Sequence, residues 1–440
     1  MTHSGHAWLT AVLPAGARRV RTDDPALRET LRRAGAELVE DGADVEIVSS
    51  RRPRGDAVLA VVLASRDRPE GGLRLVRGVL RVKRALHLRA KEQSARIALR
   101  RSGYSFVTSL LGDLNAPLPL VDGLEPASPK LPLRAAITGR KKAGTEPSIL
   151  EDALRLADVR PRSQPQVREG VVVLVGEEGV LRVSLGPGGR LAEEQRAALE
   201  LLEAGPLPAV VRDRVPWPLG NGTVGLGSWT LERRLPGAPP AAVDEGIAAQ
   251  AMEFVVALHG VAREGEAPTL AERAEVVAAS VRPDVTRMVQ GVAERLDASL
   301  AHVPRGFAHG DFHRGNLLVE GDRLTGVIDW DHAGAGRLPL LDLYHFLVSE
   351  RRRRRRLSLG RSVVEVLVPS VAAGKEPSVR EYCAAVGMNP EPSVLVDLAL
   401  AYWLDFVARD LELYADRARR KPWMQENVYL VVERGTRWFR

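Results

Sequence analysis

Two short apolar runs separated by a polar tetrapeptide stand out in the second half of the chain. The runs cover residues 317–319 and 324–328, and the tetrapeptide Glu-Gly-Asp-Arg between them contains residue types that favour tight turns. This pattern predicts a β-hairpin. Because Asn316 enters the first strand and Asp329 leaves the second, the hairpin is expected to bring these two side chains to the same end.

The polar residues at that end form a pattern suited to phosphoryl transfer. Asp311 stands before Asn316, on a loop in which Gly310 and Gly315 tolerate unusual backbone angles. A carboxylate in this place can orient and deprotonate an attacking hydroxyl. The amide oxygen of Asn316 and the carboxylate of Asp329 are hard ligands for Mg²⁺. The spacing therefore predicts a catalytic Asp311 beside two metal-binding residues.

Apolar periodicity predicts further elements before this hairpin. Residues 170–176 and 180–185 have the pattern of paired strands, and residues 190–203 have the pattern of a helix. Helical spacing recurs at 245–258 and at 281–300. The order predicts a β-rich segment followed by a helical one.

The N-terminal third alternates between strand and helix patterns. The predicted strands lie at 19–21, 45–48, 57–64, 73–82 and 104–110, and the predicted helices at 25–34 and 88–101. This alternation is typical of a small α/β layer fold. A Pro-rich and basic stretch follows, which predicts a linker. Within it, Ser148 has the spacing of a helix N-cap for residues 148–157.

Composition narrows the class of protein. The 440 residues are 45% hydrophobic and 27% charged, which is ordinary for a globular protein. No apolar run is long enough for a membrane helix, and the first apolar run lacks the basic residues that begin a secretory signal. The single cysteine, Cys383, excludes an internal disulfide and suits a reducing cytosol, so a cytoplasmic location is expected.

The net charge of +7 raises the question of nucleic acid as a partner. Six consecutive arginines, 351–356, follow an apolar helical stretch, and neither interleaved aromatic residues nor zinc-ligand spacing accompanies them. A solvated helix end, favourable to the helix dipole, is the preferred interpretation, so nucleic-acid binding is not expected. An anionic acceptor or a membrane surface stays open as the alternative partner of this run.

The motif around Asp311 resembles the aminoglycoside phosphotransferase and choline kinase family, a branch of the protein-kinase-like fold. The resemblance is carried by His309-Gly310-Asp311, Asn316, Ile328-Asp329-Trp330 and Pro339-Leu340-Leu341-Asp342-Leu343. It implies that Asp311 is the catalytic base, that Asn316 and Asp329 hold magnesium, and that His309 and Asp342 support the catalytic loop. His313 is a second catalytic candidate, which either contacts the γ-phosphate or makes an ordinary loop hydrogen bond.

The same resemblance implies a nucleotide site in the β-rich segment. Arg182 occupies the strand position at which kinases carry a Lys for the α and β phosphates, and its forked donors also fit phosphate. Glu194, rather than Glu193, is the expected helix partner, and the backbone near Leu235 is the expected contact for the adenine edge. No Gly-rich cap precedes the paired strands at 170–176 and 180–185. The alternative for Arg182 is a half-exposed strand residue without a ligand.

Acceptor recognition is expected from the late helices, as in the family that the motif resembles. Residues 393–419 have helical spacing, and Asp397, Trp403 and Asp405 fall near one another on the wheel of such a helix. These three residues are acceptor candidates. The alternative is a polar helix face.

The N-terminal segment faintly resembles the tail of class I methyltransferases. However, Thr22-Asp23-Asp24-Pro25 stands where those enzymes carry glycines that approach the cofactor. A degenerate, non-catalytic α/β domain is therefore predicted, with acceptor recognition or dimerisation as its role.

Together these patterns predict an α/β N-terminal domain followed by an α+β protein-kinase-like bilobal domain. The expected boundaries are 1–125 for the degenerate Rossmann- or methyltransferase-like domain, 126–164 for the linker, 165–240 for the small β-rich lobe and 241–440 for the large helical lobe. The predicted function is ATP-dependent phosphorylation of a hydroxyl on a small molecule or glycan, with Mg²⁺ as the metal and GTP as an alternative nucleotide. The competing hypothesis is a nucleotide-binding pseudokinase or adaptor without phosphotransfer.

Overall fold

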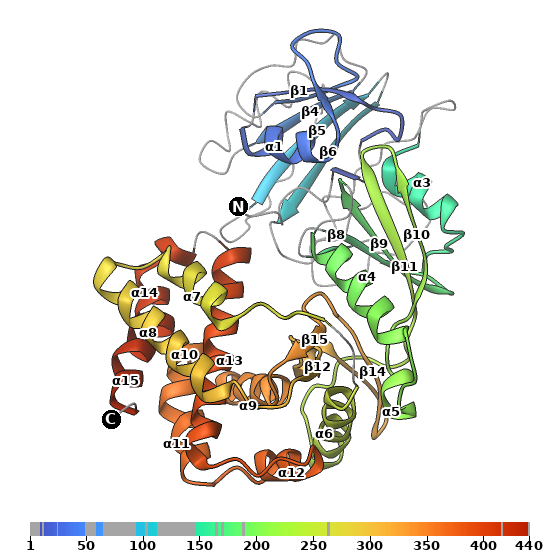
Figure 1. The fold of residues 1–440 in the computed structure, drawn as a ribbon. Helices are drawn as coiled ribbons and strands as arrows, with labels where there is room; N and C mark the ends of the chain where they lie inside the picture. Colours follow the sequence, from blue (N-terminus) through green and yellow to red (C-terminus); the bar gives the residue numbers. More distant parts are fainter. Residues whose placement is uncertain are drawn as a thin grey trace. The chain divides into compact units, whose positions relative to one another are not determined.

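Figure 1 shows the computed structural model of the chain, which divides into two compact units. The first unit consists of His3–Ala192 and Trp217–Arg234, and the second of Glu193–Pro216 and Leu235–Arg440. The structure describes residues 9–10, 13–23, 25–48, 59–64, 94–101, 104–111, 147–162, 166–168, 171–186, 190–261, 265–414 and 417–438. The division after Arg234 falls directly before Leu235, near which the adenine contact is expected.

The N-terminal part of the first unit is a six-stranded sheet with the order β2-β1-β3-β4-β5-β6. Its strands are β1 (Arg19–Thr22), β2 (Glu37–Leu38), β3 (Val45–Val48), β4 (Leu59–Ala64), β5 (Ser94–Arg101) and β6 (Tyr104–Leu111), with α1 (Pro25–Arg33) between β1 and β2. Strands β1 to β4 are parallel, whereas β5 and β6 pair in antiparallel fashion. The predicted α/β character is present, although the sheet is mixed.

The predicted helix at 88–101 is wrong over its second half, because Ser94–Arg101 forms strand β5. In this segment Ala95, Ile97 and Leu99 recur at every second position, which is the period of a strand. The strand pairs along its whole length with β6. Pairing with β6 therefore makes Ser94–Arg101 a strand and not a helix. The predicted strand at 73–82 and residues 88–93 lie outside the described residues.

The second sheet of the first unit is antiparallel, with the order β10-β11-β9-β8-β7. Its strands are β7 (Gln166–Arg168), β8 (Val171–Val175), β9 (Gly179–Leu185), β10 (Pro218–Val224) and β11 (Gly227–Arg233). The hairpin of β8 and β9 forms where the apolar pattern predicts it, with alternate residues buried. An antiparallel sheet followed by a mainly helical unit is the order that the apolar periodicity predicts.

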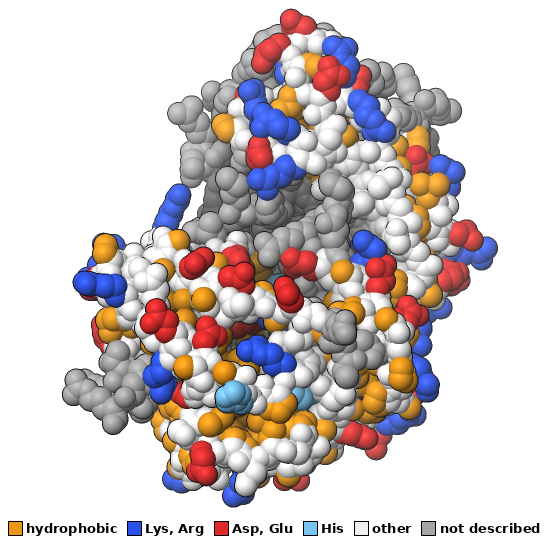
Figure 2. All heavy atoms as spheres, in the orientation of Figure 1, with side chains coloured by type: hydrophobic (Ala, Val, Ile, Leu, Met, Phe, Trp, Pro, Cys, Tyr) orange, Lys and Arg blue, Asp and Glu red, His pale blue; other side chains and the backbone are white. Residues whose placement is uncertain are grey.

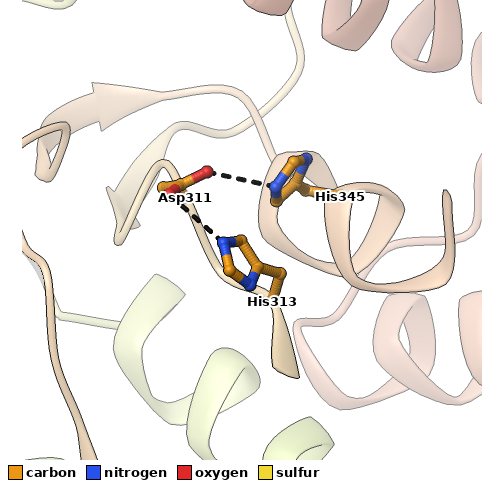
Figure 3. A group of neighbouring side chains, drawn as sticks. All are labelled: Asp311, His313 and His345. Carbon is orange, nitrogen blue, oxygen red and sulfur yellow. Dashed lines mark ion pairs between the residues drawn. The ribbon is translucent and has the colours of Figure 1, made fainter. Parts of the chain in front are cut away.

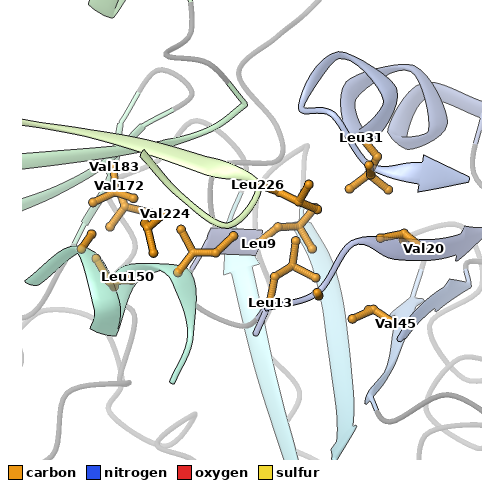
Figure 4. Packing of buried hydrophobic residues seen from close by; sticks show 14 of the residues in the cluster. Leu9, Leu13, Val20, Leu31, Val45, Leu150, Val172, Val183, Val224 and Leu226 are labelled. Carbon is orange, nitrogen blue, oxygen red and sulfur yellow. The ribbon is translucent and has the colours of Figure 1, made fainter. Parts of the chain in front are cut away.

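One hydrophobic core joins the two sheets of the first unit (Figure 4). Leu13 from the N-terminal part, Leu150 from helix α3 (Ile149–Leu156) and Val183 from β9 are all buried in this cluster. Helix α3 begins after Ser148, whose side chain accepts the Glu151 N–H in a capping box, as its spacing predicts. The segments that the sequence assigns to a domain, a linker and a small lobe therefore share one core.

The second unit is mainly helical (Figure 1). Its helices are α4 (Arg190–Glu203), α5 (Ala209–Arg212), α6 (Glu245–His259), α7 (Leu270–Ala278), α8 (Pro283–Leu300), α9 (Leu341–Arg355), α10 (Leu359–Ser362), α11 (Val368–Ala372), α12 (Pro377–Ala385), α13 (Pro392–Leu413), α14 (Lys421–Met424) and α15 (Leu430–Trp438). Helix α13 packs against α7, α8, α9 and α11, and most of its residues are buried. A helix that is apolar on nearly all sides belongs in the core of its unit.

Short strands position the candidate site within this unit. Strands β13 (Leu317–Glu320) and β14 (Arg323–Val327) form the predicted hairpin, with Gly321 at a φ of +63° in its turn. A 3₁₀ turn at Arg314–Asn316 leads into β13. Strand β12 (Gly306–Ala308) precedes this motif in the chain and β15 (Gly334–Arg337) follows it. These two strands pair with each other.

The arginine run belongs to helix α9, which continues to Arg355. Its basic last turn is favourable to the helix dipole, as the preferred interpretation of the run expects. On the face shown in Figure 2, Lys and Arg side chains are scattered among acidic and apolar ones. Among the described residues, no helix combines the length and the apolar character needed to cross a bilayer.

Candidate active site

The hairpin of β13 and β14 brings the predicted metal ligands to one end of the motif. Leu317 pairs with Val327, and the backbone N–H of Ile328 donates a 2.9 Å hydrogen bond to the carbonyl of Asn316. Asn316 and Asp329 therefore flank the same end of the hairpin. Asp329 has a φ of +68°, a left-handed conformation that is uncommon outside glycine and is often found at functional loops.

Helix α9 holds the loop that carries Asp311 through Asp342. The carboxylate of Asp342 accepts the backbone N–H of His309 at 2.7 Å and that of Gly310 at 2.8 Å. This is the supporting contact that the resemblance implies for Asp342. Burial raises the pKa of Asp342 to about 6, although the two N–H donors act in the opposite direction.

His309 ties the same loop to the end of β14. Its Nδ1 accepts the Asp311 N–H at 3.2 Å, so the neutral ring carries its proton on Nε2 and donates it to the Ile328 carbonyl at 3.0 Å. The ring is fully buried and packs edge-on against Trp330. Burial lowers the pKa of His309 to about 4, which keeps the ring neutral near pH 7. The contacts of His309 are therefore structural.

Three side chains surround the carboxylate of Asp311, and two of them, His313 and His345, are drawn in Figure 3. His345 Nε2 lies 3.1 Å from Oδ1, and His313 Nε2 lies 3.5 Å from Oδ2. Asn316 Nδ2 donates to Oδ2 at 3.2 Å and to the Asp311 carbonyl at 2.9 Å. The Asp311 side chain nevertheless keeps 31% of its surface exposed, so part of the carboxylate is accessible.

These donors keep Asp311 ionised. Burial would raise its pKa, but the hydrogen bonds from His313 and His345 outweigh burial and hold the pKa well below its usual range. Burial lowers the pKa of His345 to about 4, so this ring is neutral near pH 7. A carboxylate that is ionised at neutral pH can orient a hydroxyl and accept its proton.

The oxygen donors at this end of the hairpin fit Mg²⁺. Because Nδ2 of Asn316 faces Asp311, the amide oxygen occupies the other branch of the amide group and can serve as a ligand. Asp329 adds a half-buried carboxylate at the same end. Amide and carboxylate oxygens suit Mg²⁺ better than a soft transition metal. Metal binding by Asn316 and Asp329 stays a prediction that this chemistry supports.

The predicted nucleotide contacts lie in both units. Arg182 on β9 belongs to the first unit, and its Nε lies 3.3 Å from Oε1 of Glu232 on the neighbouring strand β11. The sequence predicts Glu194 as the partner of Arg182 and gives no indication of the ion pair with Glu232. Glu194 is half-buried on α4, and Leu235 is buried at the start of a segment of the second unit. The nucleotide roles of Arg182, Glu194 and Leu235 stay predictions.

Two of the acceptor candidates on α13 are occupied by contacts inside the second unit. Asp397 is ion-paired with Arg295 and accepts a 2.5 Å hydrogen bond from the Ser299 hydroxyl. Trp403 is 1% exposed and donates its Nε1–H to the Asn427 carbonyl at 2.7 Å. These contacts favour a structural role for both residues over acceptor binding. They also differ from the alternative of a solvated polar face.

Asp405, the third acceptor candidate, lies at the centre of a buried group of arginines. Its carboxylate is 2.8 Å from Arg273 Nε, 3.4 Å from Arg337 Nη1 and 3.6 Å from Arg409 Nε. Burial would raise the pKa of Asp405, but the three charges hold it well below its usual range. Neutralisation of these guanidinium groups is therefore the role that the structure favours for Asp405.

His345 and Tyr402 belong to the surroundings of Asp311 but were not predicted from the sequence. The His345 ring is 6% exposed, its Nδ1 lies 3.1 Å from the Tyr402 hydroxyl, and it stacks on Phe406 at 4.0 Å. His345 follows Asp342 by three residues, a spacing that puts both side chains on one face of a helix. Once Asp342 is assigned to the loop that carries Asp311, that spacing is the available signal for His345.

Residues 167–366 match the model of the phosphotransferase enzyme family. This range includes Asp311, Asn316, Asp329 and Asp342, and the match confirms the resemblance on which their assignment rests. No curated protein matches the chain. The segment that contains the candidate site is thus a phosphotransferase-family segment.

Several solved structures are similar to this chain. The gentamicin complex of APH(2")-IIa is 12% identical, with a TM-score of 0.42 and coverage of 67% of this chain and 96% of that chain. APH(3'')-Id from Streptomyces rimosus, in complex with ADP and streptomycin, is 17% identical, with a TM-score of 0.36 and coverage of 53% and 90%. A choline/ethanolamine kinase family protein from Mesorhizobium loti is 17% identical, with a TM-score of 0.38 and coverage of 60% and 83%. The family assignment rests on the family model and not on these low identities.

Proposed function

We propose that the chain is an ATP-dependent phosphotransferase that phosphorylates a hydroxyl group on a small molecule or glycan. The observation that carries this proposal is the environment of Asp311, a partly exposed carboxylate kept ionised by His313 and His345 beside the amide of Asn316. The family match over residues 167–366 supports phosphate transfer as the reaction.

Each side chain has a defined task in this reaction. Asp311 orients the acceptor hydroxyl and accepts its proton at a carboxylate oxygen. Asn316 and Asp329 would hold Mg²⁺, which neutralises phosphate charge when it is bound. His309 and Asp342 keep the loop in place, so positioning and electrostatics supply most of the rate.

A nucleotide-binding adaptor without phosphotransfer is the second candidate. It is favoured by Arg182, which stands where kinases place a Lys and which is ion-paired with Glu232. The presence of Asp311, Asn316 and Asp329 together counts against the adaptor, because an adaptor does not need a base held in an ionised state. Phosphotransfer is therefore the better-supported function.

Labelled ATP separates the two candidates. The wild-type protein, supplied with Mg²⁺, γ-labelled ATP or GTP and a panel of sugars, amino alcohols and aminoglycosides, is expected to yield a labelled product. The Asp311→Asn variant is expected to yield none. Thermal stabilisation of the wild type by Mg²⁺-ATP without transfer to any acceptor would favour the adaptor. Absence of both binding and transfer would reject both candidates.

A further inference from the structure

Helix α9 reaches the catalytic loop twice. Asp342 accepts two backbone N–H groups of the loop, and three residues later His345 contacts the side chain of Asp311. Residues three apart lie on the same face of a helix. One helix therefore holds both the backbone of the loop and the carboxylate that the loop carries.

The neighbours of His345 determine which of its two ring nitrogens carries the proton. Oδ1 of ionised Asp311 can only accept a hydrogen bond, so Nε2 of His345, 3.1 Å away, carries the proton. Nδ1 of the neutral ring is then an acceptor for the Tyr402 hydroxyl at 3.1 Å. The hydrogen bonds thus run in one direction, from Tyr402 through His345 to Asp311. Because Nε2 is already protonated, His345 does not take up the proton that Asp311 receives.

Packing leaves the His345 ring little freedom to rotate. It stacks on Phe406 with the ring centroids 4.0 Å apart and the planes inclined by 17°. The Arg409 guanidinium lies over the Phe406 ring at 3.8 Å, which adds a cation–π contact to the stack. A ring that is held by stacking and by Tyr402 can fix the rotation of a carboxylate bonded to it.

The same cluster has the composition of a metal site, since ligand atoms of Asp311, His313 and His345 all lie within 4.8 Å of one another. The hydrogen bonds argue against that interpretation. Nδ1 of His313 accepts the Gly315 N–H at 2.9 Å, so neutral His313 carries its proton on Nε2, which faces Asp311. Both histidines thus present N–H groups to the carboxylate, whereas a metal requires their lone pairs.

We propose that His345 is a positioning residue for the phosphotransfer proposed above, on which this inference rests. Its Nε2–H holds Oδ1 of Asp311, while His313 and Asn316 hold Oδ2. The carboxylate is therefore fixed in rotation, and its remaining lone pairs keep one orientation toward an acceptor hydroxyl. Without His345, the base would rotate more freely.

Variants at two positions test this role. His345→Leu removes the donor, His345→Gln supplies an amide N–H of similar reach, and Tyr402→Phe removes the hydroxyl that faces Nδ1. We expect kcat of His345→Leu, measured as ADP release from Mg²⁺-ATP, to fall roughly tenfold to hundredfold, with KM for ATP unchanged. His345→Gln should restore most of kcat, and Tyr402→Phe should have a smaller effect than His345→Leu.

NMR of the full wild-type chain with isotope-labelled histidine gives a readout that needs neither turnover nor a variant. We expect His345 to be the neutral Nε2–H tautomer at pH 7, and the Nδ1–H tautomer would overturn the proposal. Wild-type kcat in His345→Leu, together with an inactive Asp311→Asn, would also overturn it while leaving the proposed function intact. An inactive wild type with the Nε2–H tautomer would instead reject the proposed function, and the positioning role with it.

Discussion

The carboxylate of Asp342 accepts the backbone N–H of Gly310 at 2.8 Å, and this bond fixes the residue directly before Asp311. Gly310 has a φ of +81°, and a Cβ atom at this position would lie 2.2 Å from the carbonyl oxygen of His332. Both the backbone angle and the close backbone approach therefore require glycine.

Gly310→Ala is expected to lower the free energy of unfolding by roughly 3 kcal/mol or more and to abolish transfer, because backbone atoms have to move. Gly321→Ala is the matched control. Its φ is +63°, but nothing lies within 4 Å of the added Cβ, so it should cost only about 1 kcal/mol and leave transfer unchanged. Urea unfolding of both variants measures the difference, and equal costs would contradict the importance of the His332 contact.

Asp329→Ala should raise the Mg²⁺ concentration for half-maximal transfer by about tenfold or more, because one anionic oxygen ligand is lost. Asp322→Ala, in the exposed turn at the other end of the same hairpin, serves as the control and should behave like the wild type. The measurement is a Mg²⁺ titration of transfer from labelled ATP. An unchanged Mg²⁺ requirement in Asp329→Ala would remove this residue from the metal site.

Asp405→Asn should lower the free energy of unfolding by roughly 3 to 5 kcal/mol, since three buried guanidinium groups lose their shared counter-charge. The control is Asp284→Asn, which removes an exposed carboxylate paired with Arg282 and should change stability by less than about 1 kcal/mol. Denaturant unfolding at pH 7 compares the two. Similarly small losses of unfolding free energy in both variants would show that Arg273, Arg337 and Arg409 do not depend on the charge of Asp405.

Acidification should destabilise the protein through His309. Burial lowers the pKa of His309 from 6.5 to about 4, so the folded state favours the neutral ring, and this contribution is present above pH 6.5 and lost as the pH falls toward 4. The difference in unfolding free energy between the wild type and His309→Gln should therefore shrink by about 3 kcal/mol over this range. His302→Gln, at an exposed site, is the control. Parallel curves of unfolding free energy against pH for the wild type and His309→Gln would contradict the assignment of a buried neutral ring.

The hairpin of β13 and β14 was predictable because the information that specifies it is local. Apolar runs, a Gly-containing turn and the positions of Asn316 and Asp329 all lie within a short stretch of chain, and the structure forms the hairpin there. The loop contact of Asp342 was accessible only through the family resemblance. Its partners His309 and Gly310 are more than thirty residues away, beyond the reach of periodicity.

Features that depend on distant partners were not predictable in the same way. Helix propensity favours Ser94–Arg101 as a helix, yet pairing with β4 and β6 makes it a strand. Asp405 is polar in sequence, and only the fold shows that Arg273, 132 residues away, makes it part of a buried ion cluster. His345 was missed for the same reason, because its contact with Asp311 exists only after α9 has docked on the loop.

The most direct test of the central claim, that Asp311 is the base of a Mg²⁺-dependent phosphotransfer, is kcat for transfer from γ-labelled ATP in the wild type and in Asp311→Asn. The Kd of Mg²⁺-ATP is measured on the same preparations. The account predicts that kcat falls roughly hundredfold to ten-thousandfold while Kd stays nearly unchanged, because the variant keeps the shape of the side chain and loses the base. Transfer by Asp311→Asn at the wild-type rate would contradict the account.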